Sequence, residues 1–415
     1  MTLREQKARQ IVTQRAHIKR SGNLWLVPSQ SGRGRYKVDP KAKTCSCPDY
    51  DFRRQPCKHI FAVELLERTQ TVTTTTDAQG NTTTTKTETV KVTRQTYKQV
   101  WPAYNAAQTQ EKRLFQYLLK QLCAGVGEPA QTNGRPRLPI EDMLFAMAFK
   151  VYSTVSGRRF ISDLKDAHAK GYLSKLPAYN SIFRYFESPM LTEHLKMLIE
   201  ESALPLGAVE DSFAVDSSGL STCRFVQWTS AKYSEPELME ARDWLKIHIM
   251  CGTKTNVITA VEISNKFAND NPYFKPLVDS TAERFYMQEV SADKAYLSVG
   301  NMQTVIDHAA LPYIPFKSNS NERGTAATKK NPLWRRMFHY YSYNQESFLK
   351  HYHKRSNVES TFMMIKAKFG DSLRSKTKTA QVNEALCKIL CHNICCVIQS
   401  MFELNLKPKF WAEVA

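Results

Sequence analysis

The sequence lacks an uninterrupted hydrophobic segment of the length that a membrane span requires. Its most apolar stretch, residues 385–404, is interrupted by polar side chains at Lys388, His392, Asn393 and Gln399. A spanning helix needs about 20 nearly continuous apolar residues. The basic N-terminus is also not followed by the apolar core of a secretory signal. We therefore expect no membrane segment and no secretion.

The ten cysteines show no spacing typical of a secreted disulfide framework, and a chain of 415 residues does not need one. Cys387, Cys391 and Cys395 recur every fourth residue in an apolar segment, which would suit a metal site on one helix face. Cysteine is among the most buried residue types, so we favour core packing for this set. The cysteine pattern as a whole predicts a reducing, intracellular compartment.

Acidic residues are few: 39 Asp and Glu stand against 58 Lys and Arg, which gives a formal charge of +19. Hydrophobic residues make up 42% and aromatic residues 11% of the chain, as in folded proteins rather than disordered tails. A folded protein of this charge usually binds a polyanion. Nucleic acid is therefore the expected partner, and we expect a cytoplasmic, nucleoid-associated location.

The chain divides into four parts by composition, and its length allows two or three domains. Residues 1–68 are strongly basic. Residues 69–95 are rich in threonine and predict a solvated linker, although threonine is also compatible with an exposed hairpin. Residues 96–206 show helical periodicity, and residues 207–405 alternate strands with helices. The expected strands are 24–27, 35–38, 212–216, 244–250, 256–263, 287–290 and 313–317, and the expected helices of the last part are 299–308 and the segment from about 347 onward.

Four side chains of the basic N-terminal part have the chemistry of zinc ligands. Cys45-Ser-Cys47 is followed, after nine residues, by Cys57-Lys-His59. Three thiolates and one imidazole are a set that zinc binds in a closed, tetrahedral structural site. The alternative is a chance proximity of cysteines, which four ligand-type residues within fifteen positions disfavour. The pattern predicts structural Zn²⁺ bound by Cys45, Cys47, Cys57 and His59.

Three acidic residues of the last part stand where strands and helices meet. Asp216 comes directly after an expected strand, Asp293 lies where a second strand meets a helix, and Glu359 lies in an expected helix. Phosphodiester hydrolysis with two metal ions needs carboxylates that hold the ions about 4 Å apart, and hard oxygen ligands select Mg²⁺ or Mn²⁺. Each acid has an ordinary alternative, a helix cap for the aspartates and an ion pair with Arg355 for Glu359. Their joint occurrence favours a metal site.

Glu359 shares one helix face with a phenol and two cations. At about 100° per residue, Tyr352, Arg355, Glu359 and Lys366 project from one strip about 60° wide. Such a face makes a poor core but a good surface for phosphate groups, because Arg binds phosphate with a bidentate fork and Lys acts as a point charge. The face predicts contacts with a phosphate backbone beside the acids.

Two other features point less clearly to function. His248 alternates with apolar neighbours and is expected to be a strand residue, with a role near the acids as the weaker alternative. Trp334-Arg335-Arg336, preceded by Lys329 and Lys330, suits either contact with DNA or a solvated loop.

Two resemblances to known families follow from these motifs. The order Cys-x-Cys…Cys-x-His over about residues 17–67 resembles the SWIM zinc finger, a module that contacts DNA or proteins. The three acids, with Tyr352, Arg355 and Lys366 spaced Tyr-x2-Arg-x3-Glu-x6-Lys around Glu359, resemble the DDE transposases of bacterial insertion sequences, in the group marked by a Tyr-Arg-Glu-Lys signature. This second resemblance covers about residues 140–397.

The transposase resemblance implies an α/β fold with a ribonuclease-H-like mixed sheet flanked by helices, after a helical DNA-binding or dimerisation domain and the zinc module. It implies that Asp216, Asp293 and Glu359 hold two Mg²⁺ or Mn²⁺ ions and are catalytic. It also implies that Tyr352, Arg355 and Lys366 contact the DNA end. The expected activity is cleavage at transposon ends and strand transfer into target DNA, by a homodimer bound to double-stranded DNA.

Two rival functions remain open at this stage. The first is a domesticated, non-catalytic DNA-binding protein that depends on zinc, which the three intact acids disfavour because pure binding needs no carboxylates facing a polyanion. The second is a nuclease on the same core, which would cut but not join.

Overall fold

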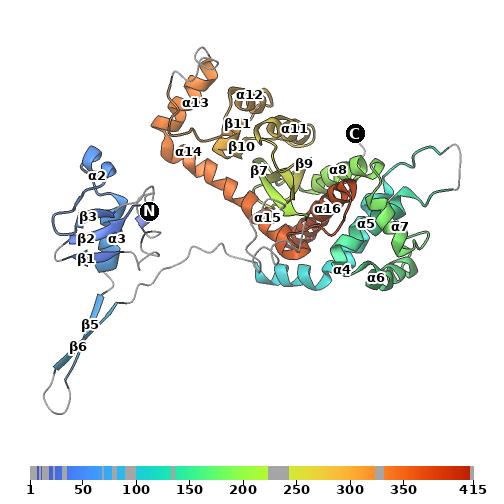
Figure 1. Ribbon diagram of the computed structural model, residues 1–415, viewed down its shortest axis with the longest axis horizontal. Coiled ribbons are helices and arrows are strands. Elements are labelled where there is room, and N and C mark those ends of the chain that lie inside the picture. Colours follow the sequence, from blue (N-terminus) through green and yellow to red (C-terminus); the bar gives the residue numbers. More distant parts are fainter. Residues whose placement is uncertain are drawn as a thin grey trace. The chain divides into compact units, whose positions relative to one another are not determined.

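The computed structural model forms two compact units, Met1–Lys98 and Gln99–Ala415 (Figure 1). The described residues are 7–8, 11, 18–21, 24–29, 35–67, 70–76, 82–88, 100–131, 136–222, 243–322 and 331–411.

The first unit is a small antiparallel sheet with short helices. The sheet has the strand order β1-β2-β3-β4, and both strands expected from the sequence are present as β2 and β3. Side chains of β2 alternate between buried and half-buried, and its buried Trp25 and Val27 pack in one cluster with Ile60 and Val63. The elements are β1 Lys19–Ser21, β2 Leu24–Pro28, β3 Arg35–Asp39, β4 Thr44–Cys45, α2 Pro48–Arg53 and α3 Lys58–Glu67.

The threonine-rich segment forms a hairpin. Strands β5, Gln70–Thr76, and β6, Thr82–Glu88, pair antiparallel with Thr73 opposite Thr85. The structure has the hairpin that was the alternative to a solvated linker, and the linker role of the segment stays a prediction. Branched side chains restrict the backbone to extended conformations, so a run of threonines favours strands once a turn brings two runs together. The bounds 69–95 stay a prediction.

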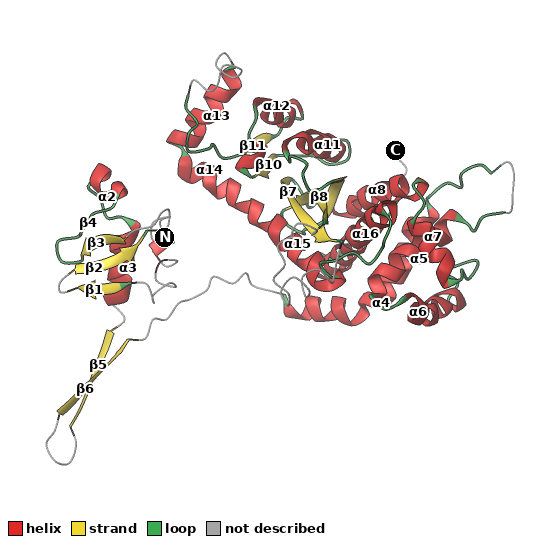
Figure 2. Cartoon of the chain, in the orientation of Figure 1, coloured by secondary structure: helices red, strands yellow, loops and turns green. Residues whose placement is uncertain are grey.

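The second unit begins with a block of helices (Figure 2), as the periodicity predicts. Helix α5 follows Pro139 and carries Glu141 and Asp142 in its first turn, where carboxylates offset the positive end of the helix dipole. The helices of the block are α4 Trp101–Ala124, α5 Ile140–Ser153, α6 Gly157–Ala169, α7 Tyr179–Phe186, α8 Met190–Ala203 and the short η2 Leu204–Leu206.

A five-stranded mixed sheet follows, in the order β11-β10-β7-β8-β9. β7, β8 and β9 are antiparallel neighbours, whereas β10 runs parallel to β7 and β11 parallel to β10. β11 ends at Tyr313 rather than at Lys317 as expected, because Pro315 has no N–H group for a strand ladder. The strands are β7 Ser212–Ser221, β8 Trp244–Gly252, β9 Ile258–Ser264, β10 Glu289–Ala292 and β11 Leu311–Tyr313.

Helices cover the sheet: α11 packs against β8 and β9, and α15 packs against β7 and β8. The expected ribonuclease-H-like mixed sheet flanked by helices is therefore confirmed, together with the helical block and the small zinc-binding module before it. The remaining elements are α11 Asn271–Ala282, η3 Lys294–Tyr296, α12 Val299–Asp307, α13 Pro332–Tyr343, α14 Gln345–Tyr352, η4 His353–Arg355, α15 Ser356–Phe369 and α16 Lys378–Glu403.

Helix α16 joins the helical block to the sheet, because it packs against α4, α5, α8 and β9. Among the described residues it is the one helix long and apolar enough to span a membrane, and 78% of its most apolar window is buried inside the protein, as in a core helix. Cys387 and Cys391 are fully buried in this helix, which confirms the core packing expected for them. Residues 99–415 thus share one core, and the division at residue 206 stays a prediction.

Candidate active site and zinc centre

An open cleft of about 610 Å³ lies along β7 and α15. Two of the three predicted acids, Asp216 and Glu359, line it, as does the predicted phosphate contact Lys366. The cleft also has an acid that the sequence motif did not include, Asp371, which follows α15. The full lining consists of Asp216, Ser217, Ser218, Glu359, Phe362, Met363, Lys366, Ala367 and Asp371.

Asp216 lies in the middle of β7, not after a strand as expected. The ladder continues beyond it, with Asp216 opposite Ile249 and Ser221 opposite Trp244. Its Oδ1 accepts a hydrogen bond from the Ser217 backbone N–H at 2.8 Å. A carboxylate on a paired strand is held more rigidly than one on a loop, which suits a metal ligand.

Asp293 lies beside Asp216 because of the sheet register. Ala292 at the end of β10 pairs in parallel with Val215 of β7, so the next residues along the two strands are Asp293 and Asp216. Neighbouring strands lie about 4.8 Å apart. Asp293 also caps η3, since its carboxylate accepts a hydrogen bond from the Lys294 backbone N–H at 2.6 Å. The cap and the position beside Asp216 are compatible, so the cap is not an alternative to a site role.

Arg355 connects two of the acids. Its Nη1 donates to Asp216 Oδ2 at 2.8 Å, and its Nη2 donates to Glu359 Oε1 at 2.5 Å. The pair with Glu359 is the expected i, i+4 pair, but the same guanidinium also holds Asp216, so the helix is not merely solvated here. Burial raises the pKa of Asp216, and so do the charges of Asp293 and Glu359, whereas the Ser217 hydrogen bond and Arg355 lower it. The three carboxylates therefore interact electrostatically.

The predicted helix face is not one continuous helix. The chain changes from α14 to the short η4 at His353 and then to α15 at Ser356. Tyr352 is the last residue of α14 and Arg355 the last of η4, while Lys366 on α15 donates to Ser218 Oγ of β7 at 2.7 Å. The Arg355 guanidinium lies 5.9 Å from the centre of the Tyr352 ring. The backbone at both ends of η4 stays in the right-handed helical region, so the helical path continues into α15. Arg355 and Lys366 therefore both reach β7, with the Tyr352 ring beside Arg355.

The donor set suits hard divalent ions, since it consists of carboxylate oxygens. The three carboxylates do not form a closed cage, however. Among the described residues, the zinc ligands are the one Cys, His, Asp or Glu group whose ligand atoms all lie within 4.8 Å of one another. Asp216 and Glu359 are spanned by the Arg355 guanidinium instead.

A half-buried polar cluster lies on the opposite face of β7 from Asp216, and sequence reasoning missed it. Asp270 accepts hydrogen bonds from Ser217 Oγ at 2.9 Å and lies 2.6 Å from Lys246 Nζ. His248 is fully buried, stacks on Tyr273 with ring centres 4.1 Å apart, and has a pKa lowered by burial to about 4. Its expected place on a strand is confirmed. The sequence signal that could have revealed this cluster is Ser217, because a polar residue next to Asp216 on a strand points to the opposite face of the sheet and needs a hydrogen-bond partner there.

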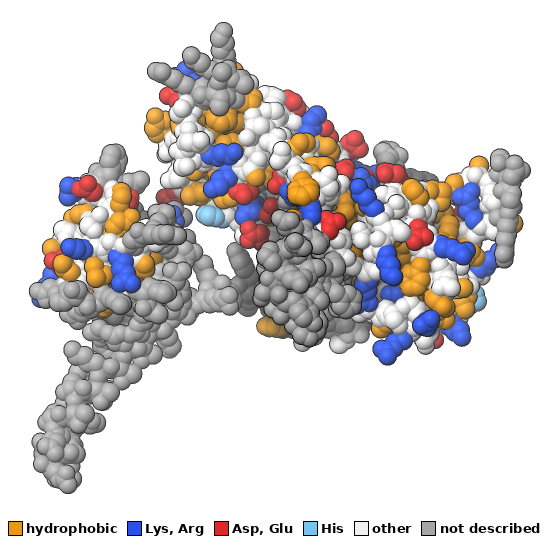
Figure 3. All heavy atoms as spheres, in the orientation of Figure 1, with side chains coloured by type: hydrophobic (Ala, Val, Ile, Leu, Met, Phe, Trp, Pro, Cys, Tyr) orange, Lys and Arg blue, Asp and Glu red, His pale blue; other side chains and the backbone are white. Residues whose placement is uncertain are grey.

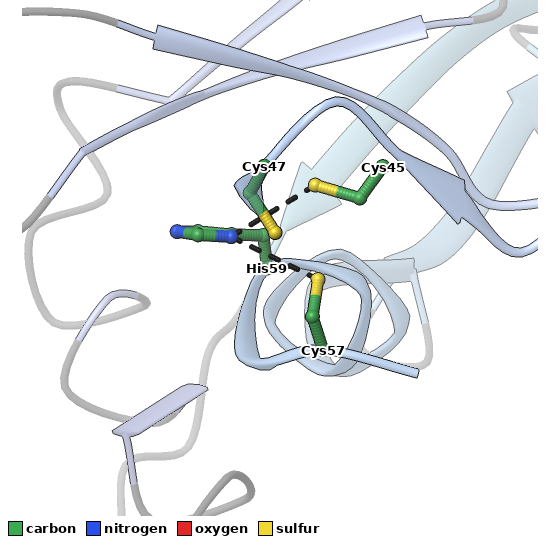
Figure 4. A group of neighbouring side chains, drawn as sticks. All are labelled: Cys45, Cys47, Cys57 and His59. Carbon is green, nitrogen blue, oxygen red and sulfur yellow. Dashed lines mark hydrogen bonds between the residues drawn. The ribbon is translucent and has the colours of Figure 1, made fainter. Parts of the chain in front are cut away.

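The four predicted zinc ligands converge in the first unit (Figure 4). His59 Nδ1 lies 3.8 Å from Cys45 Sγ and 3.8 Å from Cys57 Sγ. Tetrahedral bonds of 2.0 and 2.3 Å to nitrogen and sulfur place these atoms about 3.5 Å apart, so the set fits zinc closely. All four side chains are buried, and β4, the turn before α2 and the start of α3 supply them.

The three thiols of the cluster differ in their pKa values. Hydrogen bonds from Cys45 and His59 lower the pKa of Cys57, so Cys57 favours the thiolate, which is the form that binds zinc. The hydrogen bond with Cys57 raises the pKa of Cys45, and burial raises the pKa of Cys47, although Cys47 Sγ also accepts the Tyr50 backbone N–H at 3.4 Å as the N-cap of α2. The site is a structural zinc centre.

The basic patch around Trp334 does not have the exposed ring that stacking on DNA needs. Trp334 is 7% exposed, packs against Phe316 and donates from Nε1 to the Asn321 carbonyl at 3.1 Å. It lies in α13, so the solvated-loop alternative was wrong, whereas contact of the exposed Arg335 and Arg336 with a DNA backbone stays a prediction. Lys329 and Lys330 lie outside the described residues. Lys and Arg side chains spread instead over the visible face of the helical block (Figure 3).

Comparisons with known proteins match both parts of the chain. Residues 208–394 match the family of the transposase DDE domain, and residues 36–66 match the SWIM zinc finger. No curated protein matches the chain. A solved structure, the cryo-EM structure of the piggyBac transposase synaptic complex with hairpin DNA, is 11% identical over 74% of this chain and 77% of that chain, with a TM-score of 0.34. The two family matches confirm both resemblances seen in the sequence.

Proposed function

We propose that this chain, with its transposase DDE domain behind a SWIM zinc finger, cuts DNA at transposon ends and joins the ends to target DNA. The observation that carries the proposal is that Asp216 of β7 and Glu359 of α15 line one open cleft, with Asp293 next to Asp216 at the end of the adjacent strand β10. Neighbouring carboxylates repel one another and so destabilise the folded state, and a bound cation removes this repulsion. Binding of divalent cations therefore explains why three acids lie close together here.

In the proposed reaction, Asp216, Asp293 and Glu359 hold two Mg²⁺ or Mn²⁺ ions. When bound, these ions supply Lewis-acid activation of the attacking and leaving oxygens of the phosphodiester. Asp216 and Asp293 are fixed by adjacent strands, and Glu359 approaches from the helix side.

Arg355, Lys366 and Tyr352 are proposed to contact the DNA end. Arg355 would exchange its carboxylate partners for phosphate oxygens once ions neutralise Asp216 and Glu359, because its fork matches both groups. Lys366, whose Nζ now meets Ser218 Oγ, stands at the cleft wall as a second cation. The pKa of Tyr352 is raised by burial, so it stays a neutral hydrogen-bonding group at neutral pH.

The first unit is proposed to bind DNA or a protein partner through its basic surface, with zinc holding its fold. Two transposon ends must be brought together before joining, so we propose a homodimer on double-stranded DNA, which acts in the cytoplasm on the nucleoid.

The test is an assay with labelled transposon ends, Mg²⁺ and a target plasmid. Asp216→Asn should abolish cleavage and joining while end binding stays near that of the wild type. Asp211→Asn is the matched control, because Asp211 precedes β7 and pairs with Lys254 outside the cleft. Cleavage by Asp216→Asn at the wild-type rate would refute the assignment. Cleavage without joining by the wild type would favour the nuclease, and no cleavage with intact binding would favour the domesticated DNA-binding protein.

A further inference from the structure

A second cavity, of about 440 Å³, opens between the connection of α5 to α6, helix α7 and the loop that joins α15 to α16. The proposed reaction does not use it. Its lining combines cations with aromatic rings, and consists of Lys150, Val151, Thr154, Val155, Ser156, Gly157, Phe183, Phe186, Glu187, Phe369, Arg374, Ser375, Lys376, Ala380, Glu384 and Lys388.

The cavity carries an excess of positive charge. Four cations and two carboxylates line it, a formal sum of +2. Lys150 Nζ donates to the Val155 carbonyl and Arg374 Nη1 to the Thr154 carbonyl, each at 2.6 Å. Carbonyl oxygens accept hydrogen bonds from these side chains, but they do not neutralise the positive charge. A bound anion would neutralise it.

The carboxylates of the cavity are already engaged with the backbone or lie apart from the cations. Glu384 accepts the backbone N–H groups of Arg374 at 3.0 Å and Ser375 at 2.8 Å. Within the described ranges, no carboxylate oxygen lies in ion-pair distance of Lys150, Arg374 or Lys376. Burial and then the charge of Arg374 lower the pKa of Lys150, whereas the charge of Glu384 raises it. A negative group bound beside Lys150 and Arg374 would offset the repulsion between them.

Aromatic rings form the apolar side of the cavity. Phe183 is 46% exposed although it is a large hydrophobic residue, and Phe186 is buried beside it. A Cβ atom at Gly157 would lie 2.6 Å from the Phe183 ring, so the glycine is needed for the ring to sit where it does. Aromatic faces stack on nucleobases of any sequence. Cations beside an exposed ring suit a nucleotide, with its phosphate and its base.

The loop between α15 and α16 connects this cavity to the cleft. Asp371 lines the cleft, and Arg374 and Lys376 of the same loop line the cavity. We propose that the cavity binds one nucleotide of the DNA strand that leaves the cleft, with its phosphate at Arg374 and Lys376 and its base against Phe183. This proposal rests on the proposed function, because it places a DNA strand in the cleft.

The experiment compares Lys376→Ala with Lys378→Ala in the full chain. Both lysines are exposed, but Lys378 begins α16 and does not line the cavity. We expect Lys376→Ala to reduce the slope of log affinity for the DNA end against log salt by about 0.9, the value for one lost phosphate contact. Between 50 and 200 mM salt, wild-type affinity should then fall about 3.5-fold more than that of the variant. Lys378→Ala should keep the wild-type slope.

DNA ends in which a neutral methylphosphonate replaces a single phosphate locate the bound nucleotide. At one position the replacement should weaken binding by the wild type and have no further effect on binding by Lys376→Ala. Phe183→Ala should weaken binding of the same ends. Equal slopes for the two lysine variants, or no such position, would overturn the proposal. So would a mononucleotide that stabilises the wild type against heat but not Lys376→Ala, since the cavity would then take a free nucleotide. If the wild type itself neither binds nor cuts the ends, the proposed function fails instead.

Discussion

Arg355 should compete with divalent cations for two carboxylates, and its removal tests this directly. The Arg355 side chain is 17% exposed and joins Asp216, 22% exposed, to Glu359, 59% exposed. A charge-assisted hydrogen bond to a mostly buried carboxylate contributes about 1.5–3 kcal/mol, and an exposed i, i+4 pair about 0.3–0.5 kcal/mol. Without divalent ions, Arg355→Ala should therefore lower the free energy of unfolding by roughly 2–3 kcal/mol.

Added Mg²⁺ should restore more stability to Arg355→Ala than to the wild type. Ions that bind only the folded state stabilise it by about 2.7 kcal/mol at a concentration of 100 times their Kd. In the wild type the same ions must first displace the guanidinium, so their apparent affinity is lower. The variant loses one cation beside Asp216 and Glu359, and it should gain a site for another.

Urea unfolding followed by tryptophan fluorescence, in EDTA and in a series of Mg²⁺ concentrations, measures both effects. Arg335→Ala is the matched control, because Arg335 on α13 forms an exposed ion pair with Glu322. This substitution should change the free energy of unfolding by less than about 1 kcal/mol, and its effect should not depend on Mg²⁺. If Arg355→Ala has wild-type stability in EDTA and responds to Mg²⁺ no more than the wild type, the competition does not exist and the reasoning about this site is wrong.

Three further predictions concern the zinc centre, the cluster behind Asp216 and acid stability. A zinc chelator, or Cys57→Ser, should unfold the first unit and leave the second intact, because structural zinc contributes roughly 10–16 kcal/mol to folding in small modules. Limited proteolysis would show whether only the first unit becomes sensitive to the protease. Asp270→Asn should raise the Mg²⁺ concentration needed for half-maximal cleavage about tenfold at unchanged DNA affinity, because Asp270 holds Ser217 next to Asp216. Asp279→Asn is the control, since Asp279 is a partly exposed residue of α11 that pairs with Lys275 and His308. Unchanged metal dependence of Asp270→Asn would contradict a positioning role. Burial lowers the pKa of His248 and His392 to about 4, below an unfolded value near 6.5. The free energy of unfolding should therefore fall by about 3 kcal/mol for each histidine as pH falls from 6.5 to 4. His392→Gln should flatten the pH profile of the urea midpoint, and an unchanged profile would show that His392 does not contribute to this loss.

The zinc ligands were the easiest residues to predict because the chain itself brings them together. Cys45 and His59 are only fourteen residues apart, and a turn with one short helix is enough to close the set. The chemistry of thiols and imidazole then names the metal. Local spacing was likewise sufficient for most strands and helices, since periodicity is a local property.

The position of Asp216 was harder, because its neighbours look like a turn. Ser217, Ser218 and Gly219 favour loops in isolation, yet all three lie in the ladder with β8. The tertiary structure gives each a reason to be small or polar: Ser217 meets Asp270, Ser218 meets Lys366, and a Cβ at Gly219 would lie 2.9 Å from the Trp244 ring. None of these partners is near in sequence.

By itself the sequence determined the kinds of chemistry available: a thiolate and imidazole set for zinc, three acids in a spacing shared with DDE transposases, and a surplus of cations for a polyanion. Only the tertiary structure decided which side chains meet. Parallel pairing of β10 with β7 sets Asp293 beside Asp216, and the packing of η4 and α15 against β7 lets Arg355 hold two acids at once. Strand register and helix packing depend on contacts between residues far apart along the chain, so no local pattern contains them.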